Sequence, residues 1–409
     1  MTPAEADARW NIRLYYVFEF FMDFGLWFGV WIKYLTVYRG FELKWVLLMD
    51  TPFWLLVATL EAPFGGLADR IGRKKVLALG AGIYSAVVFG FGFTTNYWLL
   101  FIDYSAWAFA MAARSGAGQA LIYDSMKAAG THAQFSKVAG RGFAVMLTAG
   151  VVSVLLGGLV AEATSLAFVV RVSAIFPMVA VVAAVAMREP HFEPSGRHYL
   201  HDMKEGITFA WRHPTVRWSV LLLAAVMGAG FTPVVLMQPF LIEQDVATGL
   251  FGVYQAPLRI LAVLAAVVAY RVAMLMGAGR LMAAGGAGMV IAFTGLAAFD
   301  EVWAFGFFAL PAMIQGFVRP TMDAYINHRT PSSMRATVLS VSSLCLSVQL
   351  AVFEPILGFL TDEVSLQAAS GFAAVVFALV LPPLVVVWAR ADRQHPLEED
   401  PAAAMPAGP

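Results

Sequence analysis

Long apolar stretches constrain the fold of this sequence more than any other feature. An α-helix needs about 20 apolar residues to cross about 30 Å of hydrocarbon. Twelve stretches of the 409-residue chain meet this requirement, and most are apolar on all sides, as helices among lipid or other helices should be. They span roughly residues 14–37, 45–67, 76–94, 97–122, 141–162, 166–187, 218–240, 250–275, 281–299, 301–320, 335–360 and 366–388. The pattern predicts an all-α integral membrane protein with twelve transmembrane helices.

The distribution of basic residues predicts the orientation in the membrane. Of the 27 Lys and Arg residues, 21 fall in segments on the side of the N-terminus, and three, Lys33, Arg39 and Lys44, fall on the opposite side. Cytoplasmic segments carry the excess of positive charge, so we expect both termini in the cytoplasm. The N-terminus has no cleavage signature of a signal peptide. Arg outnumbers Lys by 20 to 7, which is typical of a GC-rich bacterial genome and suggests a multi-pass protein of a bacterial inner membrane.

The chain divides into two halves of six spans. The sequence GGLVAE at 157–162 is echoed by LGFLTD at 357–362, at the same place in the second half. Repeats of this kind build many transporters, whose substrate site lies between the halves near the midplane. We therefore expect two pseudo-symmetric six-helix bundles, a cytoplasmic linker between them and a tail. Their predicted bounds are 1–187 for the first bundle, 188–217 for the linker, 218–390 for the second bundle and 391–409 for the tail.

The linker is predicted to hold an amphipathic helix on the inner membrane surface. Leu200, Met203, Ile207 and Trp211 share one helical face. A solvated loop with one helical turn is the alternative. The tail is acidic and rich in Pro and Ala, and we expect it to be disordered.

A polar motif, GGLADRIGRKKV at 65–76, follows the second span. Gly65 and Gly66 would let helices approach closely, and Gly72 permits a tight turn. Asp69 can accept hydrogen bonds from an arginine. The basic residues of the motif, which would anchor the turn on the cytoplasmic side, are Arg70, Arg73, Lys74 and Lys75.

This motif resembles, at every defined position, the signature loop between helices 2 and 3 of the major facilitator superfamily. Helix 4 contains AARSGAGQALIYD, which is similar to the family motif R-x-x-q-G, with Arg114 and Gly118 at the right spacing and Ala117 in place of Gln. The resemblance implies the major facilitator fold, in which two six-helix bundles enclose a central cavity. Helices 1, 4, 7 and 10 would mainly line this cavity, and transport would proceed by alternating access.

The strings LEAPFGGLADRIGRKK and GQALIYDSMK look most like the drug/proton-antiporter-like branch of bacterial exporters. That branch carries a helix 5 signature, g-x-x-x-G-P-x-x-G-G. Only Gly150, Gly157 and Gly158 of this signature are present, and its Gly-Pro is missing. The missing Gly-Pro weakens the assignment to the antiporter branch more than it weakens the assignment of the fold.

The resemblance also implies a gate at the inner membrane face. In the family, the Asp of the loop motif and its basic neighbours hold the inner ends of the two halves together in the outward-open state. The start of helix 11 near Arg335 would be their partner in this chain. The residues implied for the gate are Gly65, Asp69, Arg70, Gly72, Arg73, Lys74 and Asp124.

Charged residues inside the spans are candidates for function, because each costs at least about 2.5 kcal/mol at the middle of a helix. Glu19 and Asp23 lie four residues apart on one face of helix 1, and Arg114 lies at a similar depth in helix 4. Two carboxylates that are close in a low dielectric cannot both ionise cheaply, so we expect one to exchange protons. A structural pair neutralised by Arg114 is the alternative. Asp103, three turns from Arg114, either belongs to this proton-coupling or substrate site or caps the outer vestibule.

Other intramembrane charges are expected to be structural. Asp50 is predicted to lie at the outer interface of helix 2. Arg259 and Glu354 are at similar depths in helices 8 and 11, and we expect them to form an ion pair.

Aromatic, Met and Gln side chains on helices 1, 7 and 10 are candidates for the cavity lining. A cavity with soft and aromatic walls suits an amphiphilic ligand, although such residues also fill any membrane bundle. The candidates are Phe24, Trp27, Phe231, Met237, Gln238, Met313 and Gln315.

Other classes of function lack their signatures. The sequence has no nucleophile elbow, Walker loop, dinucleotide fingerprint or complete metal-ligand set, so we expect no catalytic residue, metal or cofactor. The 27 basic and 27 acidic residues give no net field that would attract nucleic acid. A transporter-like receptor or scaffold would need a sizeable soluble domain or long tail, and the twelve spans leave none in this sequence.

The sequence therefore favours a monomeric secondary active transporter in the lipid bilayer. The preferred function is proton-coupled export of an amphiphilic drug-like or secreted small molecule. The alternative is a uniporter or importer of an endogenous charged metabolite, with Glu19, Asp23 and Arg114 binding the substrate.

Overall fold

The computed structural model of the chain describes residues 2–190, 199–331 and 334–395, and this part is almost entirely helical, with no β-strand. The first half comprises α1 (Pro3–Asp23), η1 (Leu26–Gly29), α2 (Trp31–Lys33), η2 (Tyr34–Tyr38), α3 (Leu43–Leu48), α4 (Asp50–Ile71), α5 (Arg73–Phe93), α6 (Tyr97–Arg114), α7 (Ala117–Ala128), η3 (His132–Gln134), α8 (Phe135–Ala163), α9 (Leu166–Ser173) and α10 (Ile175–Ala186). The linker helix is α11 (Tyr199–Arg212). The second half comprises α12 (Pro214–Glu243), η4 (Thr248–Leu250), α13 (Phe251–Met276), α14 (Ala278–Ala298), η5 (Val302–Phe308), α15 (Ala309–His328), α16 (Arg335–Glu363) and α17 (Leu366–Gln394).

The described helices match the predicted spans. Ten are long and apolar enough to cross a membrane, and a bent pair, Pro3–Gly29 with Trp31–Tyr38, makes an eleventh. The remaining predicted span is α6 with α7, which carries Asp103 and Arg114 and is interrupted at Gly116, where φ is +74°. Its charges lower its hydropathy, yet α6 packs against both α4 and α5 as a bundle helix does. The predicted fold class is confirmed.

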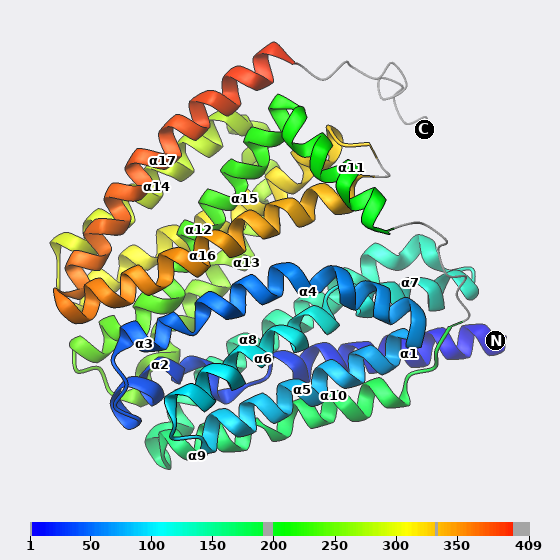
Figure 1. The fold of residues 1–409 in the computed structure, drawn as a ribbon, viewed down its shortest axis with the longest axis horizontal. Helices are drawn as coiled ribbons and strands as arrows, with labels where there is room; N and C mark the ends of the chain where they lie inside the picture. Colours follow the sequence, from blue (N-terminus) through cyan, green and yellow to red (C-terminus); the bar gives the residue numbers. More distant parts are fainter. Residues whose placement is uncertain (1, 191–198, 332–333, 396–409) are drawn as a thin grey trace.

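The same packing pattern recurs in both halves. In the first half, α5 packs against α10, α4 against α6, and α1 against α8. In the second half, the equivalent pairs are α14 with α17, α13 with α15, and α12 with α16. The two six-helix bundles are therefore pseudo-symmetric. Figure 1 shows the first bundle, blue through cyan to the green of α10, below the second, green to red.

Two equivalent helix pairs join the bundles: α4 with α16, and α8 with α13. Small residues allow the close approach of α8 and α13. A Cβ atom on Gly252 would lie only 2.2 Å from the carbonyl oxygen of Val154, and one on Gly158 only 2.6 Å from that of Thr248. Backbone therefore packs directly on backbone between these helices.

We call the end of the molecule that holds α11 and the start of α1 the linker end, and the opposite end the far end (Figure 1). Polar contacts join the bundles at the far end. The backbone N–H of Lys44 donates to Asp362 at 2.6 Å, and the Lys44 ammonium lies 2.5 Å from Glu363. The N–H of Gly249 donates to Glu162 at 3.2 Å. The structure is thus closed at the far end.

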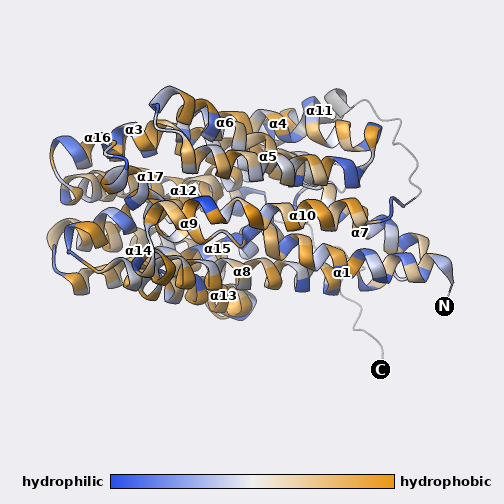
Figure 2. Cartoon of the chain, turned by 90° about the horizontal axis from the view of Figure 1, so that it is seen from below, coloured by the Kyte–Doolittle hydropathy of each residue, from blue (hydrophilic) through white to orange (hydrophobic). Residues whose placement is uncertain are grey.

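The surface has the character of a membrane protein. Figure 2 shows hydrophobic residues along the helices and hydrophilic residues gathered toward the ends of the bundles. Large apolar side chains are strongly exposed on α13, such as Leu275 at 84% and Val267 at 76%. Water would not favour such exposure, whereas lipid does. The chain is a multi-pass membrane protein.

Contacts with the second bundle place the linker helix and extend the last helix. The linker helix α11 packs against α12 and α16, and a Cβ on Gly206 would lie 2.5 Å from the Thr337 side chain. The side chains of Leu200 and Met203 lie outside the described residues. Helix α17 continues to Gln394, four residues beyond the predicted end at 390, because its last turn is held by contacts with the second bundle described below. Residues 396–409 of the predicted tail lie outside the described part.

Candidate functional site

Helix 1 is broken at the level of its charged residues. Helix α1 ends at Asp23, η1 follows at Leu26–Gly29, and the span then bends by 49° between Pro3–Gly29 and Trp31–Tyr38. Two glycines lie in the interruption. A Cβ on Gly29 would be 3.2 Å from the backbone of Val154, so Gly29 permits the close approach of α8. Discontinuous helices of this kind are typical of transporter binding sites.

Side chains from four other helices satisfy the backbone groups that the break leaves free. This matters because an unsatisfied peptide group inside a membrane costs several kcal/mol. The hydrogen bonds are Ser153 Oγ to Gly25 O (2.5 Å), Trp27 N to Ser173 Oγ (3.1 Å), Gln255 Nε2 to Gly29 O (2.9 Å), Gln238 Nε2 to Phe28 O (3.2 Å) and Ile32 N to Gln238 Oε1 (3.0 Å). The two glutamines belong to the second bundle, so the broken segment also joins the two bundles.

Glu19, Asp23 and Arg114 come together beside this break. Arg114 is the last residue of α6, and its Nη2 lies 2.5 Å from Asp23 Oδ2. The same nitrogen donates to Glu19 Oε2. The Glu19 side chain is 10% exposed and the Asp23 side chain 33% exposed. One guanidinium therefore holds two carboxylates, and Asp23 is the more accessible of the two.

A fourth charged residue reaches this cluster from the second bundle. The guanidinium carbon of Arg259, on α13, lies 4.9 Å from the ring centroid of Phe28. Arg259 lines one cavity of about 170 Å³ together with Asp23 and Arg114. The predicted ion pair between Arg259 and Glu354 is wrong. Helix α13 packs against α8 and α15, whereas α16, which carries Glu354, packs against α3 and α4.

A larger cavity of about 420 Å³ adjoins the first at Arg259. Its walls come from α8 of the first bundle and from α12, α13 and α15 of the second. Apolar side chains dominate, and Arg319 and Asp323 add a charged pair whose closest atoms are 3.8 Å apart. Pockets of this size and character bind small molecules.

Two of the seven predicted lining residues, Phe231 and Gln315, line the larger cavity. Met313 does not line either of these two cavities, since it precedes Gln315 by two residues and therefore lies on a different face of α15. Met237 also lies outside both cavities and packs against the buried core.

The other three predicted lining residues are structural here. Phe24 packs edge-on against Phe176 at 4.7 Å, and Trp27 is 4% exposed within a cluster of aromatic rings. The sequence analysis expected a continuous span over 14–37, and the break after Asp23 changes which face these residues present. Gln238 is 2% exposed because it bonds to the broken segment of helix 1.

Asp103 lies away from the Glu19–Asp23–Arg114 cluster. Its carboxylate sits against α5, where a Cβ on Gly90 would be 2.5 Å from Oδ1. Asp50 was expected at the outer interface, but it is 4% exposed and lies between the bundles. The reason is that α3 covers the start of α4 while α16 packs against both.

The motif at 65–76 forms the turn between α4 and α5. Gly72 adopts φ +102°, a conformation that favours glycine. Arg73 forms an ion pair with Asp124 of α7, and its Nη2 lies 3.8 Å from Asp69 Oδ1. These contacts tie three helices of the first bundle together at the linker end.

Glu189, which follows α10, completes this turn. Its carboxylate accepts hydrogen bonds from the backbone N–H groups of Arg73 at 2.7 Å and Lys74 at 3.0 Å, and so caps the start of α5. The Lys74 ammonium donates to the carbonyl of Met187 at 3.2 Å. The sequence analysis missed Glu189, because no local pattern places it beside a turn more than a hundred residues earlier.

The described contacts of the gate residues Asp69, Arg73 and Lys74 lie within the first bundle. A Cβ on Gly65 or Gly66 would meet nothing within 4 Å, and Arg70 is exposed. Arg335 instead donates to carbonyl groups of its own bundle, those of Asn327 at 3.0 Å and Thr330 at 3.2 Å. A structure closed at the far end leaves these groups apart, as alternating access requires.

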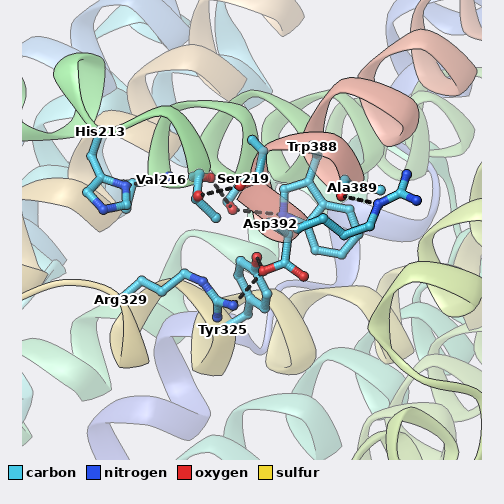
Figure 3. Close-up of polar contacts among 11 residues, drawn as sticks. His213, Val216, Ser219, Tyr325, Arg329, Trp388, Ala389 and Asp392 are labelled. Atoms are coloured by element: carbon cyan, nitrogen blue, oxygen red, sulfur yellow. Dashed lines mark hydrogen bonds and ion pairs between the residues drawn. The ribbon is translucent and has the colours of Figure 1, made fainter. Parts of the chain in front are cut away.

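The second bundle has its own polar cluster at the linker end (Figure 3). Asp392 accepts hydrogen bonds from the hydroxyl of Tyr325 and the guanidinium of Arg329, both at 2.5 Å. Trp388 donates to Ser219 at 3.0 Å. These bonds hold the last turns of α17 against α15 and α12, which explains why the helix extends past its predicted end.

Comparisons with known proteins agree with this architecture. The family model for the Major Facilitator Superfamily matches residues 14–275. A stretch of 70 residues is 34% identical to an uncharacterized MFS-type transporter of Methanocaldococcus jannaschii, and covers 17% of this chain and 18% of that protein. The chain thus matches under a fifth of that relative.

Solved structures show the same fold. A variant of the nucleoside transporter NupG superposes with a TM-score of 0.75 at 12% identity, over 93% of this chain and 99% of that one. A bacterial homologue of the human lysosomal transporter Spinster, inward-facing and occupied, gives 0.71 at 16% identity, over 97% and 98%. Sequence identities this low show similarity of the fold alone. Since the family model covers well over half of the sequence, and the bundles repeat around a shared cavity, the chain belongs to the major facilitator superfamily.

Proposed function

We propose that this chain exports an amphiphilic small molecule in exchange for protons, as a monomer in the inner membrane of a bacterium. The observation that carries the proposal is the Glu19–Asp23–Arg114 cluster beside the break in helix 1, at the edge of a cavity between the bundles. The positive-inside rule supports a cytoplasmic linker end. The conformation closed at the far end would then be the inward-facing state.

The walls of the larger cavity support an amphiphilic substrate. Phe143, Leu147 and Phe231 offer apolar surface, while Arg319 and Asp323 offer opposite charges at one side. A molecule with an apolar body and a polar or charged group would satisfy both parts of this cavity.

Proton exchange is assigned to Asp23. Its side chain is more exposed than that of Glu19 and lines the smaller cavity, whereas Glu19 is the buried partner of Arg114. Protonation of Asp23 would leave Glu19 and Arg114 as a neutral pair. A cationic group that binds beside Asp23 favours the ionised carboxylate, so ligand and proton compete, which is the basis of antiport.

The decisive experiment measures proton release when lipophilic cations are added to the purified, weakly buffered protein. We expect release from the wild type and from Glu42→Gln, a control at an exposed carboxylate of the far end. Asp23→Asn should release none, while neutral ligands still bind. If wild type and Asp23→Asn both release no proton for any cation, the antiport mechanism fails.

A second candidate function is uniport or import of a charged metabolite. The observation that favours it is the presence of two guanidinium groups, from Arg114 and Arg259, in the smaller cavity. Guanidinium groups suit carboxylate and phosphate recognition. Binding of small anions that is lost in Arg259→Gln, and that exchanges no proton, would favour this function over export.

A further inference from the structure

Two carboxyl groups that the proposed mechanism does not use lie in the interface between the bundles. Asp50 of α4 is 4% exposed and Glu354 of α16 is 3% exposed. The helices are in direct contact here, since Thr51 Oγ1 donates to the Ala351 carbonyl at 2.6 Å and Trp54 Nε1 donates to Glu354 Oε2 at 2.9 Å. The two carboxyl groups therefore belong to opposite bundles but to one contact.

The described hydrogen bonds of this pair leave one fully buried oxygen without a donor. The hydroxyl of Tyr104, on α6, donates to Asp50 Oδ1 at 2.6 Å. Asp50 Oδ2 is fully buried and has no hydrogen-bond partner among the residues that the structure describes. An oxygen of an ionised carboxylate that has no hydrogen-bond donor is costly in a buried site. Protonation of Asp50 would remove this negative charge, and the hydrogen bonds of Thr51 to Ala351 and of Trp54 to Glu354 place the Glu354 carboxyl group in the same contact of α4 and α16.

Neither carboxyl group forms an ion pair within the described residues. The basic residue of α3, Lys44, pairs with Glu42 and Glu363 at the far end. The tyrosine of α5 nearby, Tyr84, stacks on Trp107 at 5.8 Å between ring centroids and makes no described hydrogen bond to either carboxyl group. The charged residues of α12, α15 and α17 make no described hydrogen bond or ion pair with Asp50 or Glu354 either. Two buried carboxylates without a cation cannot both be ionised at low cost.

We propose that Asp50 and Glu354 form a second proton-binding site, which holds one proton while the bundles are closed at the far end. Loss of this proton would leave two negative charges facing each other across the contact of α4 and α16. The electrostatic repulsion between these charges and their hydration by water both favour separation of the bundles at the far end. Protonation therefore stabilises the closed far end, and deprotonation opens it.

The pair is also close to the central cavity. The ring of Trp54 lies 6.0 Å from the ring of Phe231, and Phe231 lines the larger cavity. Two aromatic side chains, Trp54 and Phe231, thus connect Glu354 to the wall of the cavity. This inference concerns conformational control and stands whether the substrate is a drug-like molecule or a metabolite.

The test measures the opening of the far end as a function of pH without any substrate. Spin labels at Thr95→Cys and Asp300→Cys, two exposed far-end positions on opposite bundles, report this opening in a Cys345→Ser background. In the wild type we expect the distance between the labels to lengthen as the pH rises from about 5 to about 9, the range in which buried carboxyl groups titrate. In Asp50→Asn/Glu354→Gln the distance should stay short at every pH, because neutral amides cannot ionise.

Two further variants sharpen the test. Glu61→Gln removes a partly buried carboxyl group from the same helix, three turns away, and should keep the wild-type pH response. Tyr104→Phe removes the hydroxyl that stabilises ionised Asp50, so its opening should need a higher pH than that of the wild type. This variant keeps the proposal testable if the double amide variant does not fold.

A far end that does not respond to pH in the wild type would overturn the proposal. So would a double variant that still opens with rising pH, or an opening that follows the concentration of Na⁺ at constant pH. Failure of Asp23→Asn to affect proton release would refute the assignment of proton exchange to Asp23 but would leave this result unchanged, since no ligand is added here.

Discussion

The contact between α8 and α13 predicts that a single methyl group will change the conformational equilibrium of the transporter. In Gly252→Ala, the added Cβ would lie 2.2 Å from the carbonyl oxygen of Val154 and 2.6 Å from the Cα of Leu155. Ordinary contacts begin near 3.4 Å, so the two helices must separate by about 1 Å. Neither contact is with a flexible side chain, so rotamer changes cannot relieve the overlap.

The magnitude follows from the cost of overpacking. Such a methyl group costs about 1–3 kcal/mol in a packed contact. Alternating access separates the bundles at the far end in the other state, so the cost falls on the state that is closed there. The equilibrium should shift about 5- to 150-fold toward the state that is open at the far end.

Spin-label distances between Thr95→Cys and Asp300→Cys would measure this shift. Gly140→Ala is the matched control, because it lies within α8 and a Cβ there would meet nothing within 4 Å. The control should keep the wild-type distance distribution. If Gly252→Ala and Gly140→Ala gave the same distribution, the backbone contact would not limit far-end opening and the reasoning would be refuted.

Two further predictions concern the turn between α4 and α5. Asp69→Asn should bias the protein toward the conformation closed at the far end and reduce transport while folding is retained; unchanged maleimide labelling of Gln315→Cys in the cavity, in a Cys345→Ser background, would contradict the gate assignment. Glu189→Gln weakens the cap on the N–H groups that start α5, so it should lower the free energy of unfolding by about 0.5–2 kcal/mol, which thermal unfolding in detergent would detect; an unaltered midpoint would mean that the cap contributes nothing.

Much of the fold follows from local properties of the sequence. The length of each apolar stretch decides whether a helix can cross the membrane, and this depends only on the residues of that stretch. The predicted spans therefore agree with the helices, apart from ends such as the start of α1 at Pro3 instead of 14 and the end of α17. Glu19, Asp23 and Arg114 could also be found, because charges within apolar spans are visible in the sequence, and the structure places them in contact.

The partners of other charged residues could not be predicted in this way. Glu354 contacts Trp54, 300 residues away in the chain, and Arg259 reaches the smaller cavity rather than Glu354. Which charges meet depends on how the two bundles dock, and docking is set by backbone contacts such as that of Gly252. A pattern within one helix carries no information about the helix that will face it.

The break in helix 1 also depends partly on the local sequence and partly on tertiary contacts. The sequence by itself determined an apolar helix with two acids and two glycines. Only the tertiary structure decided that the helix would break after Asp23, because hydrogen bonds from four other helices satisfy the backbone groups that the break exposes. Hydrophobic length is a property of one segment, whereas a broken helix in a membrane is stable only when its neighbours supply the missing hydrogen bonds.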